Sequence, residues 1–440
     1  MIEPRKPHLL YAGIILVLCA VLLASCTTQP KVDENKVHLV FSTFLKEEVF
    51  NSQIKQPVEA KFPEIELRYD WENSFITEGL SNAREIGDIR HSLVRDSTMD
   101  VDYIPDFPGS GFFDAEDLTP YIESNQLDIS HINRKIWNHA ESLQTHGELA
   151  ILPYSRKLLA MYYNKQIFDK YGVEYPRDGM TWNEVLALAR QLPSGVRLDL
   201  SINAWINLVY QLGIDWQDHT GNLQGIREKW MRIVALYEEV AGLPGYRYWQ
   251  FPMSASDRDN GYMNNFEHNE IAMSISPYWY ITSRNNYRDR RFILQDAVQA
   301  GIDMDVVTYP VFADYPNQQP VRIEQALQLN ADSTHKEEAF RVMAYLLSGE
   351  HQLSISKQGV GSVLDNADVK ESFAAAVPEV QDRNVMAYFP PSRTDNLKKG
   401  QLLEAYEVRN KINGISLIFT YILMHRIDAE NAIEQIMEYY

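Results

Sequence analysis

The sequence predicts an α/β protein with two lobes. Segments rich in β-branched and aromatic residues alternate with segments of helical periodicity, starting in a βαβαβ order with short connections. A second series of the same kind begins near Leu149, and no Pro- or Gly-rich linker divides the chain cleanly. With 440 residues, 45% of them hydrophobic, the chain is long enough to build two cores.

The first series predicts a mostly parallel sheet covered by helices on both faces. Strands are expected over 37–44, 65–69 and 101–105, and helices over 47–62 and 77–94. Such sheets bind ligands at the carboxyl ends of their strands. The segments that follow the strands are therefore candidates for a site: 42–44, 71–74 and 106–111.

The second series continues the alternation. Strands are expected over 158–163, 271–275 and 304–309, and a helix over 226–240. Thr181 and Glu184 form a capping box, which predicts a helix from there through Leu192. Thr334 and Glu337 predict a second capping box, ahead of another apolar helix.

Residues 1–25 have the features of a bacterial lipoprotein signal peptide. Arg5 and Lys6 precede an apolar run over 9–24, which is short for a spanning helix of about 20 residues. The run ends in Leu-Ala-Ser-Cys, the pattern of a lipobox. We expect cleavage before Cys26, lipidation of Cys26 and a polar tether over 26–36, with an uncleaved signal anchor as the alternative. The protein would then be lipid-anchored to the bacterial cell membrane on its extracytoplasmic side.

Composition excludes several classes of protein. A formal net charge of -19 argues against nucleic-acid binding, which needs a clustered positive face. Two cysteines cannot build a disulfide scaffold or a four-cysteine metal site. The ordinary hydrophobic fraction does not suit a multi-span membrane protein.

Enzyme signatures are mostly absent. The chain has no HExxH, GxxxxGK[ST], GxSxG or GxGxxG motif, and its single S-x-x-K match, at 354–357, lacks the partner motifs of that chemistry. A pair of carboxylates for glycoside hydrolysis stays open, because such acids lie far apart in a sequence. We nominate no catalytic residue, metal ligand or cofactor, and favour a binding protein over an enzyme.

Aromatic residues at predicted strand ends and in loops indicate a class of ligand. The apolar face of a sugar stacks on such rings while its hydroxyl groups need fixed polar partners. Each ring could equally belong to a core, but three consecutive aromatics after a buried strand cannot all point inward. The candidates are Phe44, Trp71, Tyr154, Trp205, Tyr278, Trp279 and Tyr280.

Several blocks then resemble the family 1 extracellular solute-binding proteins, receptors of ATP-driven carbohydrate importers with the maltose-binding protein as a distant relative. The most specific stretch is 147–184, which contains GELAILPYS, YNKQIF, GVEYP and TWNE in this order. FPEIEL at 62–67 and FEHNEIAM at 266–273 are similar to further family blocks. The resemblance spans most of the chain after the signal.

The resemblance implies a periplasmic-binding-protein-like (type II) fold with a central ligand cleft and hinge crossings. By this analogy one lobe comprises 36–155 plus 310–350, and the other 156–309 plus 351–440. The hinge crossings would lie near Ser155, Tyr309 and Glu350. Such proteins close over their ligand by hinge bending.

The resemblance also implies roles for single residues. Tyr278 falls on the family's stacking Trp. Arg156 and Lys157 fall where the maltose-binding relative has a cleft acid, and two cations there favour an acidic sugar such as a uronate, unless one of them pairs with a neighbouring carboxylate. Further ligand-binding candidates are Asp106, Asn203, Trp205 and Glu324.

The sequence thus predicts a monomeric, lipid-anchored substrate-binding protein of an ABC importer. Its ligand would be a carbohydrate, specifically an oligosaccharide, with an acidic oligosaccharide as one version of this prediction. The protein would pass the ligand to membrane permease subunits. No cofactor is expected. One alternative is a surface-anchored glycan hydrolase or lyase that uses cleft carboxylates such as Asp106. Another is a sensory sugar co-receptor.

Overall fold

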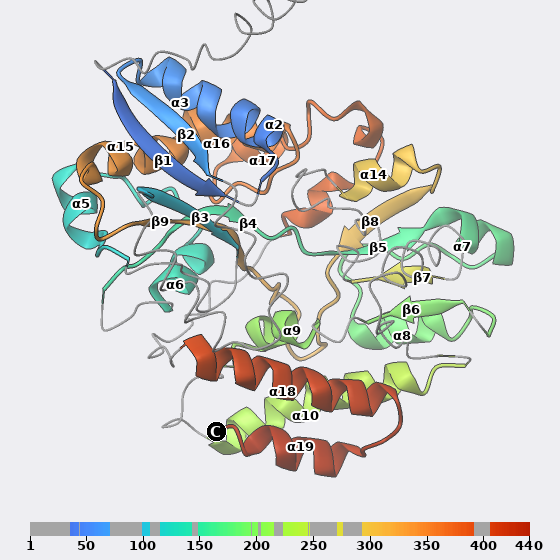
Figure 1. Ribbon diagram of the computed structural model, residues 1–440. Helices are drawn as coiled ribbons and strands as arrows, with labels where there is room; N and C mark the ends of the chain where they lie inside the picture. Colours follow the sequence, from blue (N-terminus) through green and yellow to red (C-terminus); the bar gives the residue numbers. More distant parts are fainter. Residues whose placement is uncertain are drawn as a thin grey trace, which may run out of the picture. The chain divides into compact units, whose positions relative to one another are not determined.

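Two β-sheets organise the chain in the computed structural model (Figure 1). The structure describes residues 36–43, 45–70, 99–105, 115–142, 148–194, 196–200, 204–214, 223–244, 246, 271–275, 293–390 and 405–440. Residues 38–440 form one compact unit, separate from residues 1–37.

The first sheet has five strands in the order β2-β1-β3-β9-β4. Their bounds are Val37–Thr43 (β1), Ile65–Asp70 (β2), Val101–Pro105 (β3), Leu152–Arg156 (β4) and Ile323–Leu329 (β9). β1 and β3 are parallel, but β9 is antiparallel to both β3 and β4. The prediction of a mostly parallel sheet is therefore wrong here, because β9 enters the sheet from a distant part of the sequence and in the opposite direction.

The second sheet has four strands in the order β6-β7-β5-β8. Their bounds are Ala160–Asn164 (β5), Arg197–Asp199 (β6), Ile271–Ser274 (β7) and Met304–Thr308 (β8). β6 and β7 are parallel, whereas β5 is antiparallel to both of its neighbours. This sheet is mixed as well.

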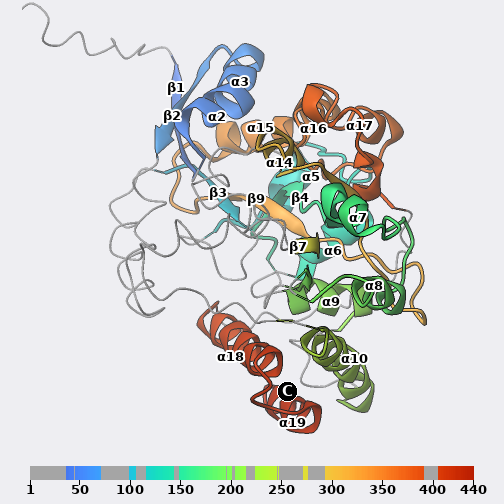
Figure 2. The ribbon, with the colours of Figure 1, turned by 90° about the vertical axis from the view of Figure 1, so that its right-hand side faces the viewer.

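Helices pack around both sheets (Figures 1 and 2). Those near the first sheet in the sequence are α2 (Glu47–Phe50), α3 (Gln56–Lys61), α5 (Thr119–Ser124), α6 (Arg134–Ser142), α15 (Lys336–Leu346), α16 (Gly349–Lys357) and α17 (Ala367–Glu371). The others are α7 (Lys165–Tyr171), α8 (Trp182–Ala189), α9 (Ala204–Leu212), α10 (Leu223–Ala241), α14 (Ile293–Gln299), α18 (Ala405–Leu423) and α19 (Ala429–Met437). Short non-α helices are the π-helix Asn51–Lys55 and the 3-10 helices Pro378–Val380 and Val385–Tyr388.

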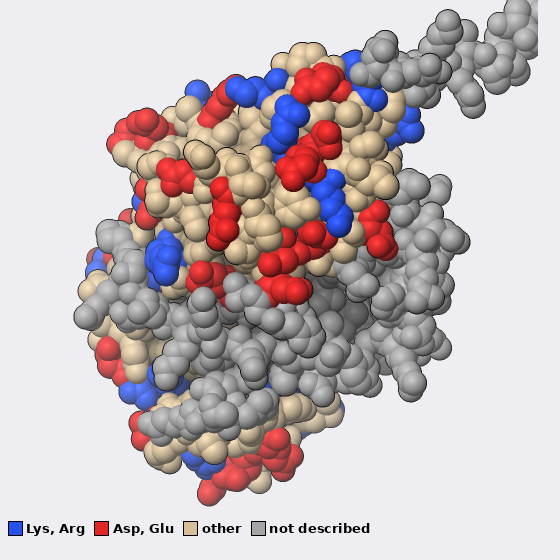
Figure 3. Space-filling model, turned by 90° about the vertical axis from the view of Figure 1, so that its left-hand side faces the viewer, with Lys and Arg blue, Asp and Glu red and all other residues tan. Residues whose placement is uncertain are grey.

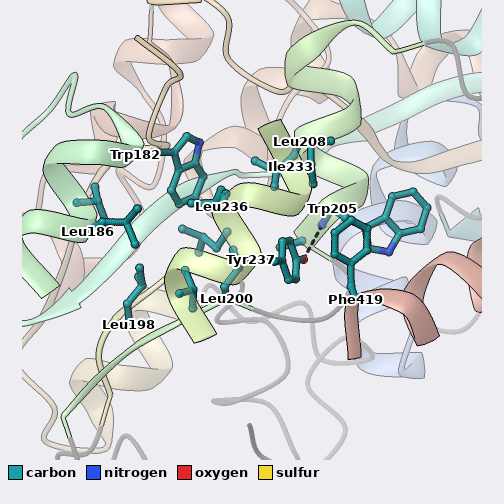
Figure 4. Packing of buried hydrophobic residues seen from close by; sticks show 14 of the residues in the cluster. Trp182, Leu186, Leu198, Leu200, Trp205, Leu208, Ile233, Leu236, Tyr237 and Phe419 are labelled. Carbon is teal, nitrogen blue, oxygen red and sulfur yellow. Dashed lines mark hydrogen bonds between the residues drawn. The ribbon is translucent and has the colours of Figure 1, made fainter. Parts of the chain in front are cut away.

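The largest core cluster lies between the second sheet and a helical layer of α10, α18 and α19, which contact one another. Figure 4 shows part of it, with the indole of Trp205 beside Tyr237 and Phe419. The hydroxyl of Tyr237 accepts a 3.0 Å hydrogen bond from the backbone N–H of Trp205. None of the described helices has the length and apolarity needed to cross a lipid bilayer.

Local helix signals succeed at one predicted capping box and fail at the other. The Thr181 side chain accepts from the Glu184 N–H, and the Glu184 carboxylate accepts from the Thr181 N–H, so α8 starts as predicted. α15 instead starts after His335, without a side-chain cap. The predicted Thr334–Glu337 box is therefore wrong, because the N-cap lies one residue later. In the preceding turn the hydroxyl of Ser333, not of Thr334, accepts a backbone N–H, that of His335.

The chain passes from one sheet to the other at least twice. It leaves the first sheet after Arg156 and enters the second at Ala160, then returns between Thr308 and Ile323. α16 stays beside the first sheet, where Gln352 Nε2 donates to the carbonyl of Tyr154 at 3.0 Å. Phe373, further along the chain, belongs to a core cluster with residues of the second sheet.

Among the charged side chains on the visible face in Figure 3, acidic ones cover more of the described surface than basic ones. This agrees with the net charge of -19 of the whole sequence. The acidic balance does not suit a partner with a phosphate backbone.

Candidate functional site

Several buried polar side chains lie in the passages between the two sheets and on the helices beside them. We call this region the joint: residues 156–160 and 308–323, together with the side chains of α6 and α9 that contact them. A buried polar group must find a hydrogen-bond partner, since leaving it unpaired costs free energy. The joint is therefore held by directed contacts rather than by apolar packing alone.

His139 of α6 connects directly to Tyr210 of α9 across the joint. The His139 side chain is fully buried, and its Nε2 lies 2.8 Å from the Tyr210 hydroxyl. Its Nδ1 accepts the backbone N–H of Ile323 at 3.2 Å, so the proton of the neutral ring sits on Nε2 and is donated to Tyr210. Burial, and secondly the charge of Arg322, lower the pKa of His139 to about 3. The ring is neutral at physiological pH.

Arg322 lies beside this pair. Its Nη1 donates to the Oδ1 of Asn207 at 2.9 Å, and its guanidinium lies 5.1 Å from the centre of the Tyr210 ring. Its carbonyl accepts the backbone N–H of Lys157 at 2.9 Å, which ties the two passages together. α9 thus contacts the returning passage through two adjacent turns.

Two buried glutamines satisfy the backbone of the returning passage. Gln211 Nε2 donates to the carbonyls of Pro310 and Gln318 at 2.7 and 3.0 Å. Gln319 Nε2 donates to the carbonyl of Tyr309 at 3.0 Å. Burial raises the pKa of Tyr309, so its hydroxyl stays protonated. These contacts fix the path of the passage without any regular secondary structure.

Arg156 ends β4, where the chain leaves the first sheet. Its backbone N–H donates to the carbonyl of Gly361 at 2.8 Å, and its guanidinium stacks on Phe389 at 4.3 Å from the ring centre. The residue is only 6% exposed, and Nη2 has no hydrogen-bond partner in the described part of the chain. Burial lowers the pKa of Arg156 to about 10, with the charge of Asp365 acting in the opposite direction.

A polar cluster behind Arg156 joins β4 and β9 to α16. The Ser155 hydroxyl donates to Gln325 Oε1 of β9. Ser362 Oγ donates to Gln352 Oε1 at 2.7 Å, which also accepts the Val363 N–H at 3.1 Å. All these side chains find partners within the protein, so the cluster positions the strand end rather than offering free groups.

The predicted aromatic candidates that the structure describes are part of the cores. Tyr154 is fully buried, packs edge-on against Tyr103 at 5.2 Å and hydrogen-bonds His351 at 3.1 Å. Trp205 is 1% exposed, and its Nε1 donates to Ser416 at 3.1 Å. Both rings act as packing groups here, because neither presents a free face.

Of the remaining predicted residues, three are described and lie in or next to the joint. Arg156 is buried, whereas Lys157 and Glu324 are half-buried. The others lie outside the described residues: Phe44, Trp71, Asp106, Asn203, Tyr278, Trp279, Tyr280 and the lipidation candidate Cys26.

Sequence reasoning missed the central contacts of the joint: His139, Asn207, Tyr210 and Arg322. They come from three distant segments, and only the polar run 317–319 between two apolar strands hints at an unusual passage. No group of three or more His, Cys, Asp or Glu residues among those described is arranged to hold a metal ion.

A family model described as bacterial extracellular solute-binding protein matches residues 98–353, which is more than half of the chain. This match includes β3, β4, both passages of the joint and the second sheet. The chain belongs to the bacterial extracellular solute-binding protein family. The predicted resemblance to family 1 is thereby confirmed.

Solved structures show the same fold. A sugar transporter from Rhizobium etli, in an open conformation, is 16% identical with a TM-score of 0.63 over 92% of this chain and 98% of that chain. A Listeria monocytogenes ABC substrate-binding protein in complex with cycloalternan is 17% identical, with a TM-score of 0.61 over 92% and 97%. A cyclic alpha-maltosyl-1,6-maltose binding protein from Arthrobacter globiformis is 14% identical, with a TM-score of 0.62 over 92% and 98%.

These similarities confirm the predicted fold class, a mixed α/β fold of the two-lobed periplasmic-binding-protein type. At such low sequence identity the similarities establish the fold of this chain but not the identity of its ligand. The family is one of binding proteins, in agreement with the preference for binding over catalysis.

Proposed function

We propose that this protein is the extracytoplasmic, lipid-anchored substrate-binding protein of an ABC importer and that it captures a carbohydrate, an oligosaccharide in particular. The observation that carries the proposal is the combination of the family match with two sheets linked by a polar joint. Structural relatives named as binding sugars add support, since three of them cover nearly the whole chain.

Binding by such an architecture works through closure of two lobes. A ligand that contacts both lobes gains part of its contacts only in the closed state, so it shifts the population towards closure. The passages 156–160 and 308–323 are the segments that would bend. Their buried hydrogen bonds limit the motion to a defined path, which suits a hinge better than a flexible linker does.

The ligand-contacting residues proposed from the sequence are Phe44, Trp71, Asp106, Arg156, Lys157, Asn203, Tyr278, Trp279 and Glu324. Tyr278 and Trp279 would stack on sugar faces, and the polar residues would bind hydroxyl groups. Tyr154 and Trp205, predicted to join them, are buried core residues. The lobe assignment, 36–155 plus 310–350 and 156–309 plus 351–440, remains part of the proposal.

Delivery requires a membrane partner. The closed form would dock on permease subunits, and the protein would act as a monomer attached through Cys26. Replacing Cys26 by Ala should release the protein from the membrane fraction and abolish incorporation of labelled palmitate. Continued membrane attachment of the Cys26→Ala variant would favour the uncleaved signal anchor.

A thermal-shift screen of residues 27–440 against neutral and acidic oligosaccharides tests the proposed function. A ligand at about 100 times its dissociation constant should stabilise the fold by about 2.7 kcal/mol. Chromatography of each glycan after incubation separates binding from the enzymatic alternative. An unchanged glycan with a clear thermal shift supports capture, whereas shortened products would establish a hydrolase or lyase.

A further inference from the structure

We infer that the ligand carries a carboxylate, as a uronate-containing oligosaccharide does, and that the guanidinium of Arg156 binds this group. The inference rests on the proposed carbohydrate-binding function and narrows its substrate class. Its starting point is a buried cation that forms no ion pair with a carboxylate among the described residues.

Arg156 is 6% exposed, yet its guanidinium forms no salt bridge with any described carboxylate, and its Nη2 has no hydrogen-bond partner among the described residues. A buried charge is normally paired, because desolvation without compensation destabilises the fold. The most direct resolution is an anion supplied from outside the chain. A carboxylate offers two acceptor oxygens that match the in-plane N–H groups of a guanidinium.

The surroundings orient the guanidinium for such a contact. Phe389 covers one of its faces at 4.3 Å, so a ligand would approach in the plane of the guanidinium, where Nη2 has no partner among the described residues. Gly361 fixes the backbone of Arg156, since its carbonyl accepts the Arg156 N–H at 2.8 Å. A Cβ at position 361 would lie 2.3 Å from the Arg156 carbonyl and 3.2 Å from its Cγ, so the close approach needs glycine.

Asp365 acts on Arg156 without forming an ion pair with it. The charge of Asp365 acts on Arg156, but the Asp365 carboxylate forms its ion pair with Lys370. The charge of Arg156 thus has no direct ion-pair partner among the described residues, in a region shielded from water. This charge favours an anionic ligand over a neutral one.

Arg156 also lies where a ligand would contact groups attached to both sheets. It ends β4 of the first sheet, while the adjoining Phe389 follows Tyr388, whose hydroxyl donates to Tyr162 of β5 in the second sheet at 2.9 Å. A carboxylate inserted between them would engage groups fixed to different sheets. Access needs opening of the joint, and the neutralised charge then favours closure around the ligand.

Isothermal titration of the full chain in mild detergent tests this inference with three probes: trigalacturonate, its methyl ester and a neutral trisaccharide. The wild type should bind trigalacturonate at least tenfold more tightly than the ester, because only the free acid carries the charge. Added salt should weaken binding of the acid more than that of the ester. Arg156→Gln should abolish the preference, and Arg156→Lys should keep a part of it.

Arg190→Gln is the matched control, because it removes one positive charge at an exposed ion pair with Glu239. It should leave the preference for the acid unchanged. Equal affinity of the wild type for acid and ester, or binding of neutral sugars alone, overturns the inference while the proposed function stands. If none of the three carbohydrates binds, both the inference about Arg156 and the proposed carbohydrate-binding function are contradicted. If Arg156→Gln does not fold, the comparison of acid with ester on the wild type still decides.

Discussion

Acidification should destabilise the protein through His139. The side chain is fully buried as the neutral ring, with Nδ1 accepting the Ile323 N–H and Nε2 donating to Tyr210. Protonation gives the ring a second N–H group, at Nδ1. This N–H points at the Ile323 N–H, so the hydrogen bond between them is lost and two donors face each other. It also adds a positive charge next to Arg322, which already lowers the pKa of His139.

The size of the effect follows from the two pKa values. The pKa of His139 is about 3 in the folded protein, against 6.5 as its ordinary value. The unfolded chain therefore binds a proton that the folded protein rejects, and stability is lost as the pH falls from 6.5 towards 3. At about pH 5 the loss from this residue is about 2 kcal/mol relative to about pH 7.5.

Urea unfolding of wild type and His139→Gln at both pH values isolates this contribution. The stability difference between wild type and variant should shrink by about 2 kcal/mol on acidification, because the variant has no proton to take up at this position. Tyr210→Phe is the control: it removes one hydrogen bond, costs about 1 kcal/mol at both pH values and keeps the pH dependence. A stability difference for His139→Gln that does not change with pH would refute the assigned neutral state.

Three further substitutions test the packing around the site by denaturant unfolding. Gly361→Ala should destabilise by about 1–3 kcal/mol, because its Cβ meets the Arg156 carbonyl at 2.3 Å, while Gly349→Ala, with nothing within 4 Å, should be nearly neutral. Trp205→Ala should cost about 3–5 kcal/mol as a core deletion, and a loss below 1 kcal/mol would show that its ring is not packed as described. Thr181→Ala should cost about 1 kcal/mol through loss of the capping box, and an unchanged midpoint would contradict that cap.

Local patterns predicted six of the nine strands in the described part of the chain, and fewer than half of its helices. The strand expected over 101–105 matches β3, and the helix expected over 226–240 lies within α10. These signals are local, since alternation and helical periodicity depend only on neighbouring residues. The family resemblance was also readable, because the blocks of 147–184 surround β4, β5 and α8, where the chain passes between the sheets.

Contacts between residues far apart in the chain could not be predicted from the sequence. β9 pairs antiparallel with β3, more than two hundred residues earlier, and no local pattern sets that direction. The contact of His139 with Tyr210 likewise depends on how two helices meet. Trp205 shows a third limit. A tryptophan can stack on a sugar or pack in a core, and residue type alone does not distinguish these roles; its burial does.

Small-angle X-ray scattering of residues 27–440, with and without a saturating oligosaccharide identified by thermal shift, tests the central claim most directly. If the two sheets belong to lobes that close over a carbohydrate, the radius of gyration should fall when the ligand is added and should recover after its removal. A radius of gyration that stays constant under saturating binding would contradict closure at the joint.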